Sequence, residues 1–345
     1  FNFVHQSIAT NGIACVIRKT PAKIRLEKEK LLKEDYFTAD IHDILIKCVE
    51  GHCNIMVAGE TGSGKTEFVK YLAAHTKSNE KIITIEDTLE LHLDKIFPQR
   101  DIVAMKTNNV ASYSDVLVTC MRQNPKWILL SEVRSAEAVS AVRNSISSGH
   151  NILSTIHADK ASAIPYRLYS LMETDLDVDQ FLSTIYRYIQ IGVHIKAFYS
   201  KEYGKFHREV DEVVEFYVDD DNKPQSHTIY RKVYGKSPVQ EKPSAHLIEY
   251  LENQNIDINS ITSTMSEGEQ VTNVNLKPPQ TNNVAHPTVA NTINNTVSNN
   301  TVKMATPTQI PKAVPVGQPG QVSTVNVGQQ PKVANVMAVP IVNNQ

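Results

Sequence analysis

Short apolar runs and helix-prone segments alternate along the first 250 residues of the chain. Runs of five or six mostly apolar residues, the length of buried strands, occupy residues 54–58, 81–85, 127–131 and 151–156. Helix-prone segments separate these runs, and the segment at 67–74 is the first of them. Because parallel strands need crossover connections of this kind, the alternation predicts an α/β fold with a mostly parallel sheet.

Residues 160–250 carry no catalytic signature. Their pattern predicts two helices, at 161–171 and 178–189, followed by antiparallel strands at 189–199, 207–217 and 228–233 with polar turns between them. We expect these elements to complete the core.

The sequence pattern of the first fifty residues predicts two small structural parts. Residues 1–20 are typical of two strands joined by a turn at Asn11-Gly12. Two strands do not form a stable sheet alone, so we expect that a part of the fold upstream of these residues is missing. Residues 21–50 predict a linker and then a helix at about 39–49.

Composition changes sharply after Tyr250, the last of the 23 Phe, Trp and Tyr residues. Residues 261–345 contain nine of the sixteen prolines and only six charged residues. Such a segment cannot bury enough apolar surface to offset the entropy that it would lose on ordering. We therefore predict a disordered low-complexity tail over 255–345, which acts as a spacer or as a docking segment for a partner.

Charge and cysteine content exclude some classes of protein. The formal charge is −2, so a basic field over the whole chain, as in many nucleic-acid binders, is absent. No apolar run approaches the roughly 18 residues that a membrane span requires, and the chain does not start with a signal-peptide pattern. The four cysteines form no C-x-x-C pair, and we expect reduced thiols rather than a zinc site.

A phosphate-binding loop follows the apolar run at 54–58. The pattern G-x-x-x-x-G-K-[ST] is complete, and it reads Gly59, Glu60, Thr61, Gly62, Ser63, Gly64, Lys65 and Thr66. Glycines allow consecutive backbone N–H groups to form an anion site, and the helix that starts near Lys65 points its positive end at that site. We expect Lys65 to contact the β- and γ-phosphates of ATP and the Thr66 hydroxyl to ligate Mg²⁺.

Reactive side chains follow the other three strands. The run at 81–85 is followed by Glu86 and Asp87, the run at 127–131 by Glu132, and the run at 151–156 by His157. The carboxyl ends of parallel strands share one edge, where ligands bind. We expect Glu132 to reach the Mg²⁺ shell or to polarise the attacking water, and His157 to sense the γ-phosphate. Glu86 and Asp87, in one cluster with Glu90, are expected to hold Mg²⁺ and its waters or to orient a nucleophilic water.

Four blocks of this sequence, in order and spacing, resemble the secretion-superfamily (traffic) ATPases of type II and type IV secretion and of pilus assembly. The loop at 59–66 resembles the Walker A motif, and residues 85–91 resemble the family's "Asp box". Residues 128–134 resemble its atypical Walker B motif, and residues 148–158 resemble its "His box". The residues of these blocks are more similar to the type IV secretion and Tad/Flp-pilus branch than to the pilus-retraction branch.

The resemblance implies that residues 1–20 are the C-terminal end of an N-terminal domain that is otherwise missing. It also implies a RecA-like ATPase domain at 51–240 and a homohexameric ring with ATP sites between subunits. Arginines would then act across the subunit interface on the γ-phosphate, and Arg122 and Arg134, which flank the Walker B strand, are the preferred pair. Arg18, Arg100 and Arg143 are the other candidates. Two positions depart from the family pattern: Glu67 replaces a Thr, and Ser131 replaces the Gly that commonly precedes the Walker B glutamate.

These features favour an ATP-hydrolysing hexameric motor. Its partners would be membrane-embedded platform proteins, which would hold it at the inner face of the cytoplasmic membrane. The alternatives are an ATP-binding scaffold without hydrolysis and a RecA-type DNA motor, although no dense Lys/Arg strip with interleaved aromatics favours DNA binding. A GTPase switch would need an N-K-x-D motif, and Asn222-Lys223-Pro224-Gln225 lacks the Asp.

Overall fold

A nine-stranded sheet is the centre of the fold in the part of the chain that the structure describes. This structure is a computed structural model, and it describes residues 2–17, 19–108, 110–172, 177–201, 204–233, 236–263 and 265, all within one compact unit, Phe1–Pro279. The strands of the sheet are β3 (Ile55–Gly59), β4 (Ile82–Glu86), β5 (Ile102–Lys106), β6 (Trp127–Val133), β7 (Asn151–Ile156), β8 (Ile191–Ser200), β9 (Lys205–Val218), β10 (Pro224–Arg231) and β11 (Val239–Gln240).

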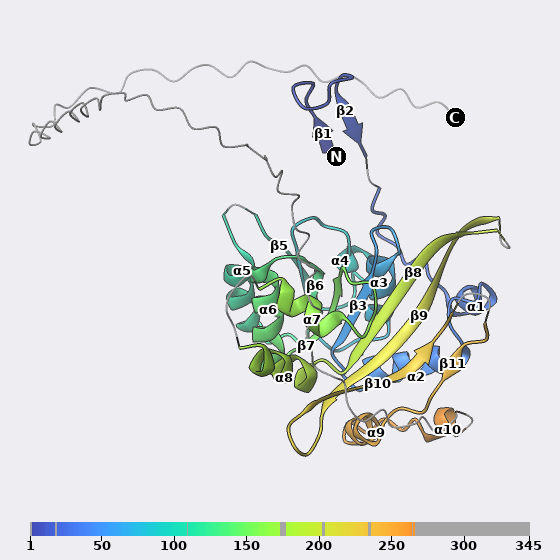
Figure 1. Cartoon of the computed structure of the whole chain (residues 1–345). Helices are drawn as coiled ribbons and strands as arrows, with labels where there is room; N and C mark the ends of the chain where they lie inside the picture. The colour runs from blue at the N-terminus through green and yellow to red at the C-terminus, as the bar shows by residue number, and fades with distance from the viewer. Residues whose placement is uncertain are drawn as a thin grey trace, which may run out of the picture. The chain divides into compact units, whose positions relative to one another are not determined.

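The strand order is β11-β10-β9-β8-β3-β7-β6-β4-β5 (Figure 1). Neighbours from β8 to β5 are parallel, whereas β8, β9, β10 and β11 pair antiparallel. The predicted α/β fold with a mostly parallel sheet is therefore confirmed. In this order β7 separates β3, the strand before the phosphate loop, from β6. Strand β6, which contains Glu132, and strand β7, which is followed by His157, are therefore neighbours.

Helices cover both faces of the sheet (Figure 1). One core contains side chains of α1 (Lys28–Lys33), α2 (Ala39–Glu50), α3 (Lys65–Ala74), α4 (Leu93–Ile96), α9 (Ala245–Glu252) and α10 (Asn259–Thr262). The other contains side chains of α5 (Tyr113–Met121), α6 (Ala136–Ser147), α7 (Ile164–Ser170) and α8 (Val178–Tyr188). The predicted helices are present, and α2 begins at the expected residue.

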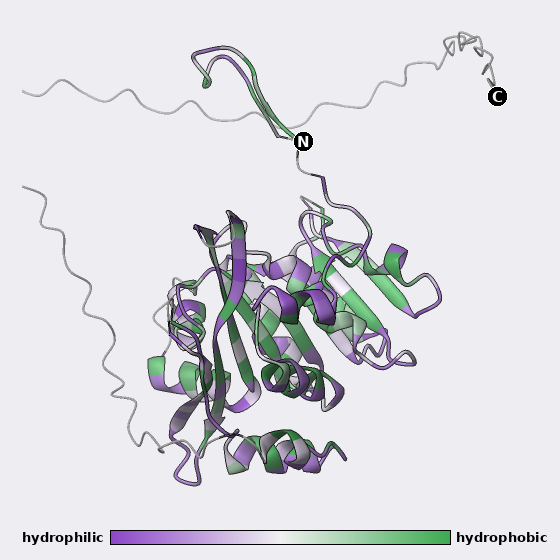
Figure 2. Cartoon of the chain, turned by 90° about the vertical axis from the view of Figure 1, so that its right-hand side faces the viewer, coloured by the Kyte–Doolittle hydropathy of each residue, from purple (hydrophilic) through white to green (hydrophobic). Residues whose placement is uncertain are grey.

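Strand β3 shows why the sequences of the central strands are continuous runs of apolar residues. Ile55 and Val57 belong to one core, while Met56 and Ala58 belong to the other. Successive strand residues point to opposite faces, so a strand that is covered on both faces needs apolar residues throughout. Hydrophobic residues accordingly concentrate along the central strands in Figure 2.

The N-terminal residues form the predicted hairpin. Strands β1 (Asn2–Val4) and β2 (Ala14–Val16) pair antiparallel, with Phe3 opposite Cys15. None of the helices within the described ranges is both long and apolar enough to cross a bilayer.

The predicted start of the tail at residue 255 was too early. Helix α10 lies beyond that boundary and contacts α2, and Ile258 just before it is buried. Ile256 and Ile261 pack against the same core. This short amphipathic segment was missed because it lacks aromatic residues and lies beside polar sequence. Residues 266–345 of the predicted tail lie outside the described residues.

A buried carboxyl group lies on β9, between the sheet and α9. Glu215 is 1% exposed, and its Oε1 accepts the backbone N–H of Ser244, the N-cap of α9, at 2.7 Å. Within the described ranges, no residue donates a hydrogen bond to its Oε2. Burial raises the pKa of the Glu215 carboxyl from 4.5 to about 8, against the lowering effect of the bonds from Ser244.

We predict that Glu215→Gln changes how stability depends on pH. Between pH 4.5 and about 8 the folded protein holds a proton on Glu215 that the unfolded chain has lost, so rising pH weakens the wild type. The neutral variant lacks this loss, so its stability relative to wild type should rise from pH 5 to 8. Urea unfolding at several pH values measures this, with the exposed Glu252→Gln as the control. Parallel curves for Glu215→Gln and wild type would contradict the prediction.

Candidate active site

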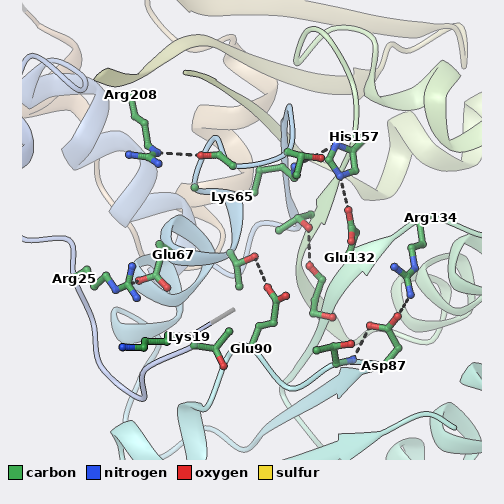
Figure 3. A pocket seen from close by; sticks show the side chains of 18 residues that line it. Lys19, Arg25, Lys65, Glu67, Asp87, Glu90, Glu132, Arg134, His157 and Arg208 are labelled. Atoms are coloured by element: carbon green, nitrogen blue, oxygen red, sulfur yellow. Dashed lines mark hydrogen bonds and ion pairs between the residues drawn. The ribbon is translucent and has the colours of Figure 1, made fainter. Parts of the chain in front are cut away.

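A cleft of about 660 Å³ opens at the carboxyl ends of β3, β4, β6 and β7 (Figure 3). Its lining residues come from the phosphate loop and the start of α3, from the ends of these strands and the segments after them, from β9 and from the linker before α1. They are Lys19, Thr20, Arg25, Thr61, Gly62, Gly64, Lys65, Thr66, Glu67, Asp87, Thr88, Glu90, Ser131, Glu132, Arg134, Thr155, His157 and Arg208.

The phosphate loop needs glycine at Gly59. Its φ is +148°, and an added Cβ would lie 2.4 Å from the backbone oxygen of Ile195 and 2.6 Å from Ser63 Oγ. Gly62, with a φ of +83°, occupies the third position of a turn in which Ser63 N–H donates to the carbonyl of Glu60 at 3.2 Å. The chain then enters α3 at Lys65, so the amide end of this helix faces the cleft.

Lys65 lies folded back on its own loop. The side chain is buried, and Nζ donates to the carbonyls of Gly59 at 2.8 Å and Glu60 at 3.0 Å. The same Nζ is 3.4 Å from Nδ1 of His157. The Thr66 hydroxyl donates to Glu90 Oε2 at 3.3 Å. The ammonium group that the motif predicts therefore lies at the centre of the loop, and the two carbonyl oxygens that accept its hydrogen bonds are uncharged.

Glu132 and His157 meet beside Lys65. Nε2 of His157 is 2.6 Å from Oε1 of Glu132, and both side chains are about a third exposed. The strands pair Leu130 with Ser154 and Val133 with Ile156, so β6 contains one extra residue between these pairs. Such a bulge re-aims side chains, and here it lies at the segment that contains Glu132. The structure thus brings these two predicted residues together.

Glu86 does not line the cleft, in contrast to its prediction as a catalytic residue and metal ligand. The side chain is fully buried, and Oε2 accepts the backbone N–H groups of Glu90 at 2.8 Å and Leu91 at 3.0 Å. Its Oε1 accepts the Thr84 hydroxyl at 3.2 Å. Burial raises the pKa of the Glu86 carboxyl, and the two backbone donors oppose that shift. Glu86 therefore organises the loop that carries Asp87 and Glu90 towards the cleft.

Asp87 and the predicted arginines lie in different places. Asp87 lines the cleft and forms an ion pair with Arg134. Arg122 caps the C-terminus of α5, just before β6 begins, and is absent from the cleft lining. Arg100 bonds to the end of α3 and Arg143 stacks on Phe181, and Arg18 lies outside the described residues.

Three basic residues in the cleft lining were not predicted. Arg25 Nε is 3.8 Å from Glu67 Oε2, and Lys19 lies in the same linker. Arg208 reaches the loop from β9, and its Nε donates to the carbonyl of Gly62 at 3.1 Å. No motif marks these residues, because they approach the loop from segments that are distant in the sequence.

The donor set of the cleft fits Mg²⁺ bound together with a nucleotide. Within the ranges that the structure describes, no three His, Cys, Asp or Glu side chains cluster as a metal cage. Magnesium in phosphate-transfer sites takes one or two protein oxygens together with phosphates and waters. The Thr66 hydroxyl and the Glu90 carboxylate, 3.3 Å apart, offer such oxygens beside the loop.

Comparison with known proteins gives a family match and several relatives. A family model described as "Type II/IV secretion system protein" matches residues 7–241. The chain is 35% identical over 240 residues to the type IV secretion system protein VirB11 of Bartonella quintana, covering 63% of this chain and 64% of that protein. It is 31% identical over 197 residues to protein pXO2-25 of Bacillus anthracis, covering 56% and 44%. The chain thus spans about half to two thirds of the length of these curated relatives.

Solved structures also resemble the chain. The VirB11 ATPase of the Brucella suis type IV secretion system, in complex with sulphate, has a TM-score of 0.44 and 26% identity, covering 55% of this chain and 62% of that one. The ATPase DotB of Legionella pneumophila has a TM-score of 0.40 and 18% identity, covering 64% and 53%.

We predict that Gly59→Ala destabilises the protein far more than Gly62→Ala. Both residues have positive φ, so each substitution should cost about 1–2 kcal/mol of conformational strain. Only at Gly59 does the new Cβ also meet a backbone oxygen, so its total should reach about 3 kcal/mol or more. Urea unfolding of the two variants measures the difference, and equal losses would contradict the packing that is described here.

Proposed function

Because the chain belongs to the family of type II/IV secretion system proteins, we propose that it is a Mg²⁺-dependent ATPase that powers a type IV secretion or pilus assembly machine. The observation that carries this proposal is the convergence of Lys65, Thr66, Glu132 and His157 on one cleft. A phosphate-binding loop alone would support nucleotide binding. The carboxylate and the imidazole beside it support hydrolysis.

Binding of ATP would begin at the phosphate loop. Backbone N–H groups and the start of α3 attract the phosphates without any charged side chain. Lys65 then exchanges its two carbonyl partners for phosphate oxygens, which are stronger acceptors because they are charged. This exchange requires only a change of side-chain conformation, since the Lys65 backbone already lies in the first turn of α3.

Hydrolysis would depend on Glu132. The carboxylate can orient a water molecule towards the γ-phosphorus and accept a proton from it, and the reaction forms ADP, inorganic phosphate and a proton. In the structure Glu132 is paired with His157, which lies next to Lys65. We propose that the γ-phosphate draws His157 away as a hydrogen-bond donor and so releases Glu132 to act on water.

Mg²⁺ would be held by the Thr66 hydroxyl, by Glu90 and by the nucleotide, with Asp87 and Glu132 able to bind its waters. When bound, the ion offsets the negative charge of the phosphates. In this proposal Glu90 is the Mg²⁺ ligand that the sequence analysis expected at Glu86. Both carboxylate oxygens of Glu86 already accept hydrogen bonds from other groups of the protein.

We further propose a homohexamer with ATP sites at subunit interfaces, attached to membrane-embedded platform proteins at the inner face of the cytoplasmic membrane. The support is family membership. Arg134 is positioned to act at the cleft, whereas Arg122 would have to reach the site of another subunit. Mass measurement with and without a nonhydrolysable nucleotide tests assembly, and DNA-stimulated turnover would favour the alternative DNA motor.

We predict that Lys65→Ala and Glu132→Gln separate binding from hydrolysis. Loss of the Lys65 charge should weaken ATP binding at least about tenfold. Glu132→Gln should leave ATP affinity close to wild type and lower turnover about 100-fold or more, because it removes only the proton acceptor. Calorimetric titration and phosphate release measure the two effects.

The matched controls for these two variants are Lys126→Ala and Glu252→Gln, which change exposed residues outside the cleft lining. A Glu132→Gln variant that turns over like wild type would remove Glu132 from the mechanism. Binding of ATP without turnover in the wild type would instead support the scaffold alternative.

We predict opposite behaviour for Glu86, the last residue of β4, and Glu90, in the loop that follows β4. Glu86→Ala should lose about 1–3 kcal/mol of stability, because it leaves buried donors without an acceptor. Glu86→Gln keeps an acceptor and should restore both stability and turnover. Glu90→Gln should fold normally but raise the Mg²⁺ requirement of turnover about tenfold. If Glu86→Gln instead abolishes turnover in a stable protein, Glu86 is a ligand or catalyst after all.

A further inference from the structure

Arg208 contacts the phosphate loop from outside the four motifs. It lies on β9 opposite Ala197 of β8, and its Nε donates to the carbonyl of Gly62 at 3.1 Å. Its aliphatic part lies over the loop, since a Cβ at Gly64 would be 3.4 Å from Arg208 Cδ. The guanidinium also stacks 4.9 Å from the ring centre of Phe206. Three contacts therefore hold one arginine at the rim of the anion site.

The guanidinium of Arg208 has capacity for another acceptor. Among the residues that the structure describes, Arg25 and Arg134 are each paired with a carboxylate of the cleft, and Arg208 has no ion pair. Its bond to Gly62 uses Nε, and a guanidinium has four further N–H donors on its terminal nitrogens. A planar donor group of this kind matches phosphate oxygens.

The sheet order shows which end of the nucleotide Arg208 would meet. Strands β7, β6 and β4, which lead to His157, Glu132 and Asp87, lie on one side of β3. Strands β8 and β9, with Arg208, lie on the other side. Figure 3 shows the same separation, with Arg208 and Glu132 on opposite sides of Lys65. If Glu132 and His157 act at the γ-phosphate, the opposite side of the loop faces the α- and β-phosphates.

We propose that Arg208 is a nucleotide-binding residue that contacts the α- and β-phosphates from the same chain while its Nε holds the loop at Gly62. The proposal rests on the proposed function, because it takes ATP as the ligand of the cleft. A contact to phosphates that ADP and ATP share contributes to the binding of both nucleotides and is maintained after hydrolysis.

The test compares ADP and ATP affinities of the full chain by calorimetric titration in wild type, Arg208→Gln and Arg208→Lys. Arg208→Gln should weaken ADP and the nonhydrolysable ATP analogue by the same factor, at least about tenfold. Arg208→Lys keeps the positive charge but lacks the planar guanidinium group, so its nucleotide affinity should lie between those of Arg208→Gln and wild type. Turnover at saturating ATP should stay close to wild type, so the effect should appear in KM rather than in kcat.

The matched control is Arg187→Gln, an exposed arginine on α8 that also makes one hydrogen bond, to Asn222 at 2.9 Å. Unchanged ADP affinity in Arg208→Gln would overturn the proposal, and so would a loss that is confined to the ATP analogue. A fall in kcat without a change in KM would also overturn it. If the wild type itself binds neither nucleotide, the proposed function fails, which is a separate result.

Discussion

The candidate site depends on the parallel alignment of β3, β7, β6 and β4. Parallel strands bring their carboxyl ends to one edge of the sheet, so residues that are up to a hundred positions apart in the sequence become neighbours there. The bulge in β6 then places Glu132 against His157, at 2.6 Å, and His157 beside Lys65. Without this alignment the phosphate loop would bind an anion but would have no partner for chemistry.

Several charged groups of the cleft already have polar partners in the structure. His157 contacts Glu132, Arg134 pairs with Asp87, and Lys65 donates to carbonyls of its own loop. A triphosphate is a stronger acceptor than these carbonyls, and it competes with the carboxylates for the basic groups. Binding would therefore exchange partners at several residues together, which links occupation of the loop to the release of Glu132.

The sequence predicted those parts of the site that local pattern encodes. The phosphate loop, Glu132 near the end of β6 and His157 directly after β7 could be found, because a short apolar run and the polar residue that follows it are local features of the sequence. The role of Glu86 could not, because a carboxylate before a loop looks the same whether it faces solvent or accepts the N–H groups of Glu90 and Leu91. Arg208 was missed because its contact with Gly62 depends on the pairing of β9 with β8.

The most direct test of this account is a crystal structure of the chain with Mg²⁺ and a nonhydrolysable ATP analogue. We expect the triphosphate within the loop at 59–66, its γ-phosphate beside His157 and Glu132, and Lys65 moved from the loop carbonyls to phosphate oxygens. A nucleotide bound elsewhere, or one whose γ-phosphate points away from Glu132 while His157 keeps its contact with that carboxylate, would contradict it.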